Sequence, residues 1–288
     1  MEKNLMDMHI HTTCSDGDKT PLEIYEMVKE KNISTFSITD HDSIIGTKQI
    51  NDMNIKDINF INGVEISTKV DKGELHILGY DMDLTNKKLN DKLNELLLNS
   101  HKNLRLVLNQ LLLDNPHIIF DNDDIEKIFK LPRVVNRVDL ARLLIKYNYC
   151  SNNQEAFNKY LIDAHNKVRK ENMSLNYNEV IDLILSSGGI PILAHNKTLK
   201  LTNEELGLFV RKLVDCGLMG IEAYHSIFNE EDVNNSLALA TKYNLLISGG
   251  SDYHGKSVKP KVELGTGIEN NLKIKQLSLV DYIQKRRC

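Results

Sequence analysis

The chain has 288 residues, which is long enough for one large α/β domain or for a domain that carries an insert. It holds 36 basic and 40 acidic residues, with a net charge of -4 and a pI near 6.2. This balance argues against a bulk electrostatic surface for long DNA or for a membrane, so an anionic ligand must be held locally.

The cysteines are scattered singly and lack the paired spacing of a disulfide framework or a zinc ribbon. They are Cys14, Cys150, Cys216 and Cys288. The first residues do not resemble an export signal, and no stretch approaches the about 18 consecutive apolar residues of a membrane helix. We therefore expect a cytoplasmic protein without a membrane segment, and the sequence leaves its oligomeric state open.

The first predicted strand covers residues 6–11. Successive side chains of a strand point to opposite faces, so Asp7, His9 and His11 share one face. Thr20 and Pro21 then open a predicted helix, and β-branched residues at 35–39 predict a strand that leads into Asp40. Two further strand-like segments follow at 59–66 and 74–80.

Residues 85–170 differ in character, because leucines recur there at helical spacing among Asn and Lys. Shorter helical patterns follow at 138–147 and 154–164. We expect an all-helical insert whose leucines form its core rather than a surface for a partner.

Strands and helices alternate again after the insert. Helices are predicted at 178–187, 203–215 and 230–243, and strands at 190–194, 220–224 and 245–248. This rhythm predicts a mostly parallel sheet, and about seven such units favour an α/β, TIM-like barrel over an open sheet. The barrel would comprise residues 1–84 and 171–288, with the insert at 85–170.

Polar residues suited to chemistry lie at the ends of these predicted strands. They are His9, His11, Asp16, Asp40, His41, Glu65, His76, His195, Glu222, His225, Asp252 and His254. The carboxyl ends of barrel strands converge on one mouth, so these residues would meet there. Mixed imidazole and carboxylate donors suit Mn²⁺, Fe²⁺ or Zn²⁺, and clustered ions of this kind support phosphoester hydrolysis or carbon-nitrogen hydrolysis.

With these residues in place, the chain resembles the PHP (polymerase and histidinol phosphatase) family over residues 4–84 and 176–268. The motifs that carry the resemblance are His9-x-His11, Thr39-Asp40-His41-Asp42, Gly63-Val64-Glu65, Ala194-His195 and Gly250-Ser251-Asp252-Tyr253-His254. The resemblance implies a distorted (β/α)7 barrel that binds two or three divalent metal ions.

The resemblance also implies which residues hold each ion. One set is His9, His11, Glu65 and Asp252; the second is Glu65, His76 and His195; the third is Asp16, His41 and His254. Asp16 stands where some family members have histidine, which bears on whether the third site is filled.

Within the family, the chain is similar to the branch of nucleoside 3',5'-bisphosphate phosphatases and 5'-3' exoribonucleases. The features are Ser15-Asp16-Gly17, the helical insert, and the run from Gly220 to Ser226. In the insert, Arg137-Val138-Asp139-Leu140-Ala141-Arg142 resembles that branch's Arg-Pro-His-x-Ala-Arg, so Arg137 and Arg142 would bind phosphate from above the barrel mouth, unless both are only solvated helix positions. The replaced residues, with Asn196 after His195, affect the choice of substrate more than the hydrolytic chemistry.

The remaining predicted roles concern catalysis and substrate. His225 would protonate the leaving oxygen or bind the scissile phosphate, and Asp252 and His254 complete the predicted catalytic set. Lys197 is a predicted substrate contact, and Lys200, Lys167, Arg169 and Lys170 are weaker ones. Asp7, Asp40 and Asp42 are expected to orient imidazoles.

Three functions compete at this point. The first is a metal-dependent phosphoesterase that acts on a nucleoside 3',5'-bisphosphate or on the 5' end of short RNA. The second is a phosphatase for histidinol phosphate or another small phosphomonoester. The third is a PHP module without turnover that binds nucleic acid or a partner protein; lost ligands would be its signature, and none is missing.

Overall fold

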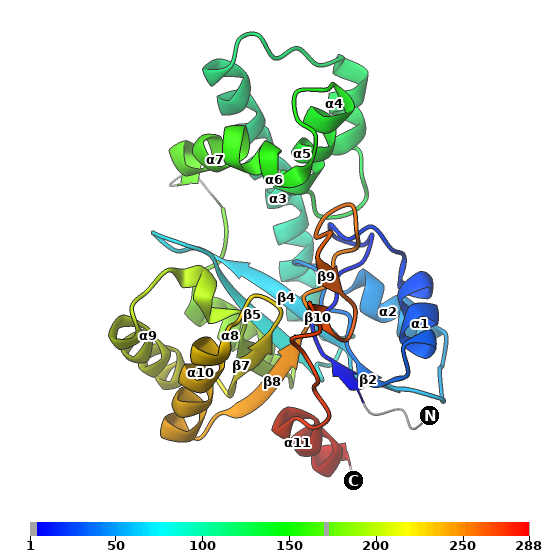
Figure 1. Cartoon of the computed structure of the whole chain (residues 1–288), viewed down its shortest axis with the longest axis vertical. Helices are drawn as coiled ribbons and strands as arrows, with labels where there is room; N and C mark the ends of the chain where they lie inside the picture. Colours follow the sequence, from blue (N-terminus) through cyan, green and yellow to red (C-terminus); the bar gives the residue numbers. More distant parts are fainter. Residues whose placement is uncertain (1–4, 170–172, 288) are drawn as a thin grey trace. The chain divides into compact units, whose positions relative to one another are not determined.

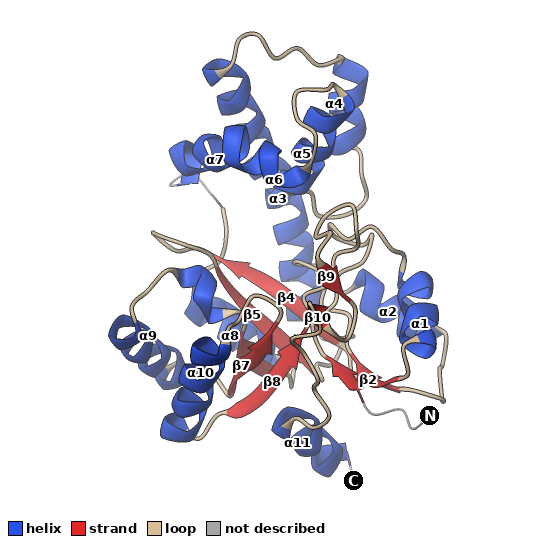
Figure 2. Cartoon of the chain, viewed as in Figure 1, coloured by secondary structure: helices blue, strands red, loops and turns tan. Residues whose placement is uncertain are grey.

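The computed structural model describes residues 5–169 and 173–287 (Figure 1). Within these ranges the chain forms two compact units, one made of the residues up to Asp91 and from Leu175 onward, the other of Lys92–Ser174. The first unit is of mixed α/β class and the second consists of helices (Figure 2). The predicted boundary between residues 170 and 171 lies outside the described ranges. No helix within them is long and apolar enough to cross a membrane.

The strands of the first unit form three sheets within the described residues. A parallel sheet has the order β1 (Leu5–Asp7), β2 (Ile33–Phe36), β3 (Asn59–Phe60). A mixed sheet has the order β4 (Gly63–Thr68), β5 (Leu75–Tyr80), β6 (Ile190–Leu193), β7 (Gly220–His225), β8 (Leu246–Gly250). The third is the antiparallel pair β9 (Val262–Glu263) and β10 (Gly267–Ile268).

The predicted α/β class is confirmed, but the structure gives no closed barrel of paired strands among the described residues. Two of the three isolated parallel bridges among the described residues join different sheets: Ile10, after β1, pairs with Tyr253, after β8, and His41, after β2, pairs with Glu65 of β4. The expectation of a mostly parallel sheet is wrong around β5, which is antiparallel to both of its neighbours. The connection from β4 to β5, residues 69–74, is too short for the crossover that parallel neighbours need.

The segment 59–66 was expected to be one strand, and it divides into β3 and β4, which belong to different sheets. The break falls at Asn62, whose side-chain oxygen accepts from the Met82 amide at 2.9 Å and whose amide group donates to the Met82 carbonyl at 3.1 Å. The next position, Gly63, has no room for a side chain, because a Cβ there would lie 2.3 Å from Ser37 Oγ. Side-chain bonds and close packing therefore end one strand and start the next.

The helices of the first unit are α1 (Pro21–Glu30), α2 (Ile45–Asp52), α8 (Tyr177–Ser186), η3 (Asn196–Leu199), α9 (Asn203–Asp215), α10 (Glu230–Tyr243) and α11 (Ser278–Arg287). The helices predicted at 178–187, 203–215 and 230–243 are found to within a residue, and the first helix begins where it was predicted, whereas α2, η3 and α11 were not predicted. Helix α1 begins at the predicted place because Thr20 and Glu23 form a reciprocal capping box ahead of Pro21.

The first strand is shorter than predicted, but its alternation is confirmed. Met8 and Ile10 are fully buried, each in a hydrophobic cluster of the first unit. His9 and His11 alternate with them in sequence and bring their Nε2 atoms to 3.2 Å from each other. Burial of the two apolar side chains thus holds both imidazoles toward one centre.

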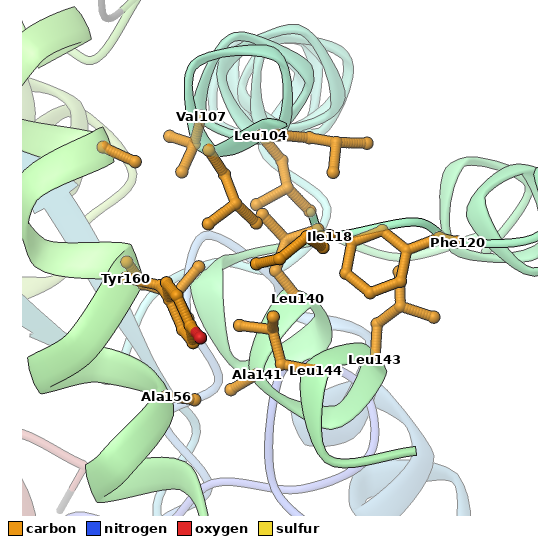
Figure 3. Packing of buried hydrophobic residues seen from close by; sticks show 14 of the residues in the cluster. Leu104, Val107, Ile118, Phe120, Leu140, Ala141, Leu143, Leu144, Ala156 and Tyr160 are labelled. Carbon is orange, nitrogen blue, oxygen red and sulfur yellow. The ribbon is translucent and has the colours of Figure 1, made fainter. Parts of the chain in front are cut away.

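The helical unit has its own core, as the leucine pattern predicted (Figure 3). Its helices are α3 (Lys87–Asp114), which begins in the first unit, α4 (Asn122–Phe129), α5 (Arg137–Lys146), α6 (Asn153–Ala156), the π-helix η1 (Phe157–Leu161) and α7 (Ile162–Val168). Leu104, Leu108 and Leu111 of α3 are buried against Leu140 and Leu144 of α5. The expected helix at 154–164 is interrupted by the π-helical turn.

This core makes a prediction about stability. Leu111→Ala should destabilise the helical unit by about 2–5 kcal/mol, because Leu111 is fully buried and its loss leaves a cavity. Leu113→Ala is the matched control on the same helix, since Leu113 is 74% exposed, and it should change stability by less than about 0.5 kcal/mol. Urea unfolding followed by circular dichroism measures both. Equal midpoints for the two variants would contradict the packing described.

Candidate metal centre

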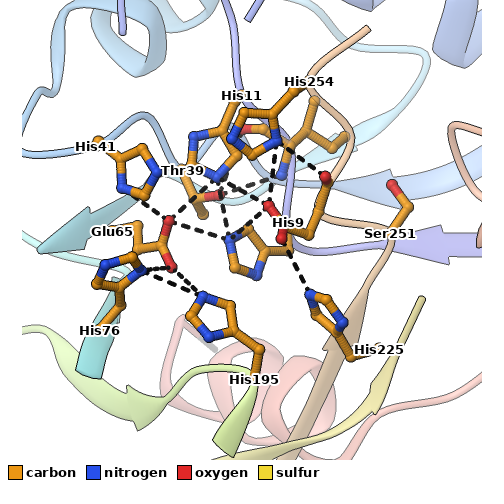
Figure 4. Close-up of polar contacts among 12 residues, drawn as sticks. His9, His11, Thr39, His41, Glu65, His76, His195, His225, Ser251 and His254 are labelled. Carbon is orange, nitrogen blue, oxygen red and sulfur yellow. Dashed lines mark hydrogen bonds and ion pairs between the residues drawn. The ribbon is translucent and has the colours of Figure 1, made fainter. Parts of the chain in front are cut away.

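The first unit brings together donors that are far apart in sequence (Figure 4). They are His9, His11, Asp16, His41, Glu65, His76, His195, Glu222, His225, Asp252 and His254, and they fall into five overlapping groups with ligand atoms within 4.8 Å of one another. Every predicted metal-ligating residue belongs to one of these groups, and so do the predicted catalytic residues. Their roles as ligands remain predictions, whereas their convergence is a property of the fold.

Glu65 of β4 lies at the middle of the cluster (Figure 4). Its Oε1 is 2.9 Å from His76 Nδ1 and 2.7 Å from His195 Nε2. Its Oε2 is 3.2 Å from His11 Nε2 and 3.0 Å from His41 Nδ1. A single buried carboxylate thus connects imidazoles from β1 and its extension, from β5, and from the ends of β2 and β6.

Asp252 follows β8 and uses its two oxygens differently. Oδ1 lies 3.3 Å from His11 Nε2, 3.3 Å from His254 Nδ1 and 3.6 Å from His9 Nε2. Oδ2 lies 2.5 Å from Lys259 Nζ and 3.2 Å from His225 Nε2. Oδ1 therefore faces the imidazoles that the resemblance assigns to a metal, and Oδ2 faces two other groups.

The third predicted set also comes together. Asp16 Oδ1 is 3.3 Å from His254 Nε2 and 3.6 Å from His11 Nδ1, and its Oδ2 is 3.9 Å from His41 Nε2. His11 thus lies between the group around Asp252 and the group around Asp16. The centre is continuous rather than divided into separate sites.

Burial and charge act against each other throughout the cluster. Burial raises the pKa of Glu65, but the His41, His76 and His9 imidazoles more than offset this and hold that pKa well below its usual range. Burial lowers the pKa of His11, but the adjacent Asp252 and Glu65 carboxylates raise it to about 9. Each of these ionised carboxylates therefore depends on positive charge brought to it by its neighbours.

The cluster fits a divalent cation on the evidence of its own atoms. His11 Nδ1, His41 Nδ1 and Glu65 Oε2 are buried without a hydrogen-bond partner among the described residues, although the last two lie 3.0 Å apart. Buried polar atoms without partners are costly, and a cation held by oxygen and imidazole nitrogen would satisfy them.

His195 gives an independent sign of the same fit. Its Nδ1 lies 3.1 Å from the Thr198 hydroxyl, which donates to the Glu74 carbonyl at 2.8 Å and so accepts from the ring. A neutral His195 then has its lone pair on Nε2, only 2.7 Å from Glu65 Oε1. Two electron-rich atoms this close need a positive charge between them or beside them.

Glu222 of β7 orients two of the predicted ligands. Its Oε1 is 3.0 Å from His9 Nδ1, which leaves His9 Nε2 directed to the centre, and its Oε2 accepts from the His195 amide at 2.8 Å. Glu222 is fully buried. This arrangement is the carboxylate–histidine support that metal-binding imidazoles commonly have.

The expectation that Asp7, Asp40 and Asp42 orient imidazoles is wrong. Asp40 accepts from the Thr12 amide and hydroxyl, both at 2.7 Å, and Asp42 accepts from a backbone amide of β4. Asp7 accepts from the Ser251 amide at 2.8 Å and hydroxyl at 2.6 Å. These carboxylates, of which those of Asp7 and Asp40 are buried, satisfy backbone donors, so they fix the loops that carry the ligands rather than the rings.

His225 has a defined tautomer in its neutral form. Its Nδ1 accepts from the Ile227 amide at 3.1 Å, so the ring proton is on Nε2 and is donated to Asp252 Oδ2. His225 is buried at the centre, as predicted. Its predicted role toward a leaving oxygen or a phosphate remains a prediction.

The predicted substrate contacts outside the cluster have partners of their own. Lys197 Nζ pairs with Asp232 of α10 at 2.6 Å. Asp139, which stands where the related branch has histidine, pairs with Arg133 at 2.6 Å and lies 3.5 Å from Arg142. The Arg137 guanidinium lies 5.3 Å from the ring centre of Phe157 within the helical unit. Of the weaker candidates, Lys170 lies outside the described residues.

Sequence reasoning missed Lys259, whose ammonium contacts the centre. Burial lowers the pKa of Lys259, but the adjacent Asp252 carboxylate more than offsets this and raises it above its ordinary value. Lys259 lies in a loop, away from any strand end, where the strand-end pattern gives no signal. The only sequence cue is its proximity to the motif Ser251-Asp252-Tyr253-His254.

Three curated proteins are similar to this chain over most of their length. The phosphoribosyl 1,2-cyclic phosphate 1,2-diphosphodiesterase of Eggerthella lenta is 25% identical, with 87% of this chain and 94% of that protein covered. The 5'-3' exoribonuclease Rnm of Escherichia coli is 27% identical, with 91% and 88% covered. The 3',5'-nucleoside bisphosphate phosphatase of Chromobacterium violaceum is 24% identical, with 86% and 87% covered.

The fold and the clustered donors define a protein of the metal-binding α/β hydrolytic class. The PHP domain family matches residues 7–263, so the chain belongs to the PHP domain family. A crystal structure of a candidate metal-dependent phosphoesterase from Bifidobacterium adolescentis has the same fold, with a TM-score of 0.76 at 23% identity over 97% of this chain and 94% of that one. The predicted family is confirmed, as is the prediction of a phosphoric ester hydrolase at the level of the family. Two of the relatives carry the names of the predicted nucleotide- and RNA-related branch.

Glu65→Ala should lower the content of divalent metal in the purified protein, because its two oxygens contact imidazoles of more than one predicted site. Atomic emission spectrometry of protein prepared without chelator measures the content. Glu204→Ala, at an exposed position of α9, is the control and should retain the full complement. Equal metal content in both variants would refute a metal role for Glu65.

Glu222→Gln tests whether Glu222 orients the predicted metal ligands, since Glu222 is not itself a predicted ligand. The amide cannot hold the His9 ring as a carboxylate does, so affinity for Mn²⁺ should fall by about 10–100-fold while the fold is retained. Titration of the chelator-stripped protein with Mn²⁺ gives the affinity, and circular dichroism checks the fold. An unchanged affinity would mean that Glu222 has only a packing role.

Proposed function

We propose that this PHP-family chain is a metal-dependent phosphoesterase that hydrolyses a phosphate ester of a nucleoside 3',5'-bisphosphate or of the 5' end of short RNA. The observation that carries the proposal is the single buried centre in which oxygen and imidazole donors of the first unit converge. The names of the relatives from Escherichia coli and Chromobacterium violaceum support this substrate class. The finer fold, a distorted (β/α)7 barrel, is supported by the two single bridges beyond the ladders.

Two or three ions of Mn, Fe or Zn would be held by the three sets of residues that the family resemblance implies. When bound, such ions supply a water nucleophile at neutral pH and neutralise charge on a phosphoryl oxygen. The chain itself keeps the ligand atoms in place, since Glu222 fixes the His9 ring and Thr198 fixes the His195 ring. Burial of the carboxylates excludes competing water from around them.

Four residues are proposed to contact the substrate. His225 is the proposed group for the leaving oxygen or the scissile phosphate, and its Nε2–H already lies at the centre through Asp252. Arg137, Arg142 and Lys197 remain proposed phosphate contacts. Arginine suits this role because its guanidinium can donate to two phosphate oxygens at once.

Incubation of the Mn²⁺-loaded protein with 3'-phosphoadenosine 5'-phosphate should release inorganic phosphate, and 5'-phosphorylated short RNA should be shortened from its 5' end. A cyclic phosphate of phosphoribose belongs in the same panel because of the Eggerthella lenta relative. His11→Ala should lower kcat by at least about 100-fold, because His11 contacts both Glu65 and Asp252. His117→Ala, an exposed histidine of the helical unit, should retain full activity.

No turnover of either nucleotide substrate by the loaded wild-type protein would refute the proposed substrate class. Turnover of histidinol phosphate alone would transfer the assignment to a small phosphomonoesterase. Undiminished activity in His11→Ala would show that the reaction does not use this centre.

A further inference from the structure

Among the described residues, Lys259 is the basic side chain that donates a hydrogen bond to Asp252. None of the predicted roles includes this lysine. It lies between β8 and β9, and its Nζ donates to Asp252 Oδ2 at 2.5 Å. Asp252 in turn contacts His9 and His11 through Oδ1. The Asp252 carboxylate therefore connects the Lys259 ammonium to the predicted metal ligands His9 and His11.

The lysine contacts the oxygen of Asp252 that the imidazoles of the predicted metal ligands do not contact. Oδ1 faces His9, His11 and His254, whereas Oδ2 faces only Lys259 and His225 among the described residues. Lys259 therefore adds positive charge beside the centre without displacing a ligand atom.

Lys259 also differs from the cluster in its access to solvent. Its side chain is 37% exposed, whereas the side chain of Asp252 is 8% exposed and that of His254 is 3% exposed. An anion that approaches the centre from solvent on this side meets the ammonium first. An ammonium has three N–H donors, and Asp252 takes one of them.

The loop that carries Lys259 is held in place by the first loop of the chain. Asp18 Oδ2 accepts from the Ser257 amide at 2.9 Å, and the Lys259 amide donates to the Gly255 carbonyl at 2.9 Å. Gly255 has φ +89°, and a Cβ there would lie 1.7 Å from Asp18 Oδ1. This turn gives the lysine a defined place beside Asp252.

We propose that Lys259 is a phosphate-binding residue, which donates to an unesterified oxygen of the scissile phosphate while it stays bonded to Asp252. The proposal rests on the function proposed above. It adds the residue that attracts the substrate phosphate to the metal centre. A lysine is a compact, mobile point charge, suited to a phosphate whose oxygens move during reaction.

The alternative is that Lys259 only orients Asp252. That role is already filled by rigid partners, because His225 donates to the same Oδ2 and the Asp252 amide donates to the His9 carbonyl at 2.8 Å. A half-exposed lysine adds little to such a fixed carboxylate, since ordering its long side chain costs conformational entropy. The experiment must still separate the two roles.

The test is the binding of inorganic phosphate to the Mn²⁺-loaded protein by isothermal titration calorimetry, with bound Mn measured in parallel. Lys259→Met should weaken phosphate binding at least tenfold and keep the wild-type Mn content, which also shows that the centre is intact. Lys259→Arg should recover part of the affinity because it restores the charge. Lys261→Met, which removes a charge from an exposed position of the same loop, should match the wild type.

Wild-type phosphate affinity in Lys259→Met would overturn the proposal, and so would a loss of Mn in step with the loss of phosphate, which would make Lys259 a positioning residue. The proposed function fails separately. If the wild type binds phosphate but hydrolyses no phosphoester, while Lys259→Met binds phosphate weakly, the phosphate site at Lys259 is supported and the proposed reaction is refuted.

Discussion

The fully buried carboxylate of Glu65 is the constraint on which the rest of the centre depends. An ionised carboxylate without solvent is unstable unless positive charge surrounds it, and Glu65 has imidazoles of five histidines within 3.4 Å. Those histidines come from the extension of β1, from β5, and from the ends of β2 and β6. The fold must therefore bring these elements to one point, where a divalent cation held by neutral imidazole nitrogens would supply the positive charge that Glu65 needs.

Glu65 can occupy this point because the backbone around it is tightly fitted. The His41–Glu65 bridge joins the end of the β2 segment to β4, and the Glu65 amide donates to the Asp40 carbonyl at 3.2 Å. Gly63, two residues earlier, allows β4 to approach Ser37 more closely than any Cβ would permit. The break between β3 and β4, which the sequence pattern did not reveal, is thus part of what places the central carboxylate.

Periodicity was sufficient to predict the α/β class, the helical unit and the residues that converge, because strand ends and helix caps leave local signals such as Thr20 with Glu23. It failed where the decisive contacts are non-local. Nothing near β5 encodes its antiparallel neighbours apart from the short link from β4, and Lys259 reaches Asp252 from a loop without a repeat. The same holds for the bonds from Asp7 to Ser251 and Gly265, which lie 244 and 258 residues along the chain.

Asp7 shows how far the metal centre depends on such long-range contacts. Asp252 adopts a left-handed conformation with φ +55°, which costs energy for a residue other than glycine, although aspartate tolerates it better than most. The preceding residue, Ser251, is held by Asp7 through both its amide and its hydroxyl, and the Asp7 carboxylate also accepts from the Gly265 amide at 2.7 Å. Because Asp7 is bonded on both sides of the loop that carries Asp252 and Lys259, the strain at Asp252 is opposed by contacts made far from the imidazoles. The first strand therefore supplies two predicted ligands, His9 and His11, and also the carboxylate that keeps a third in its strained position.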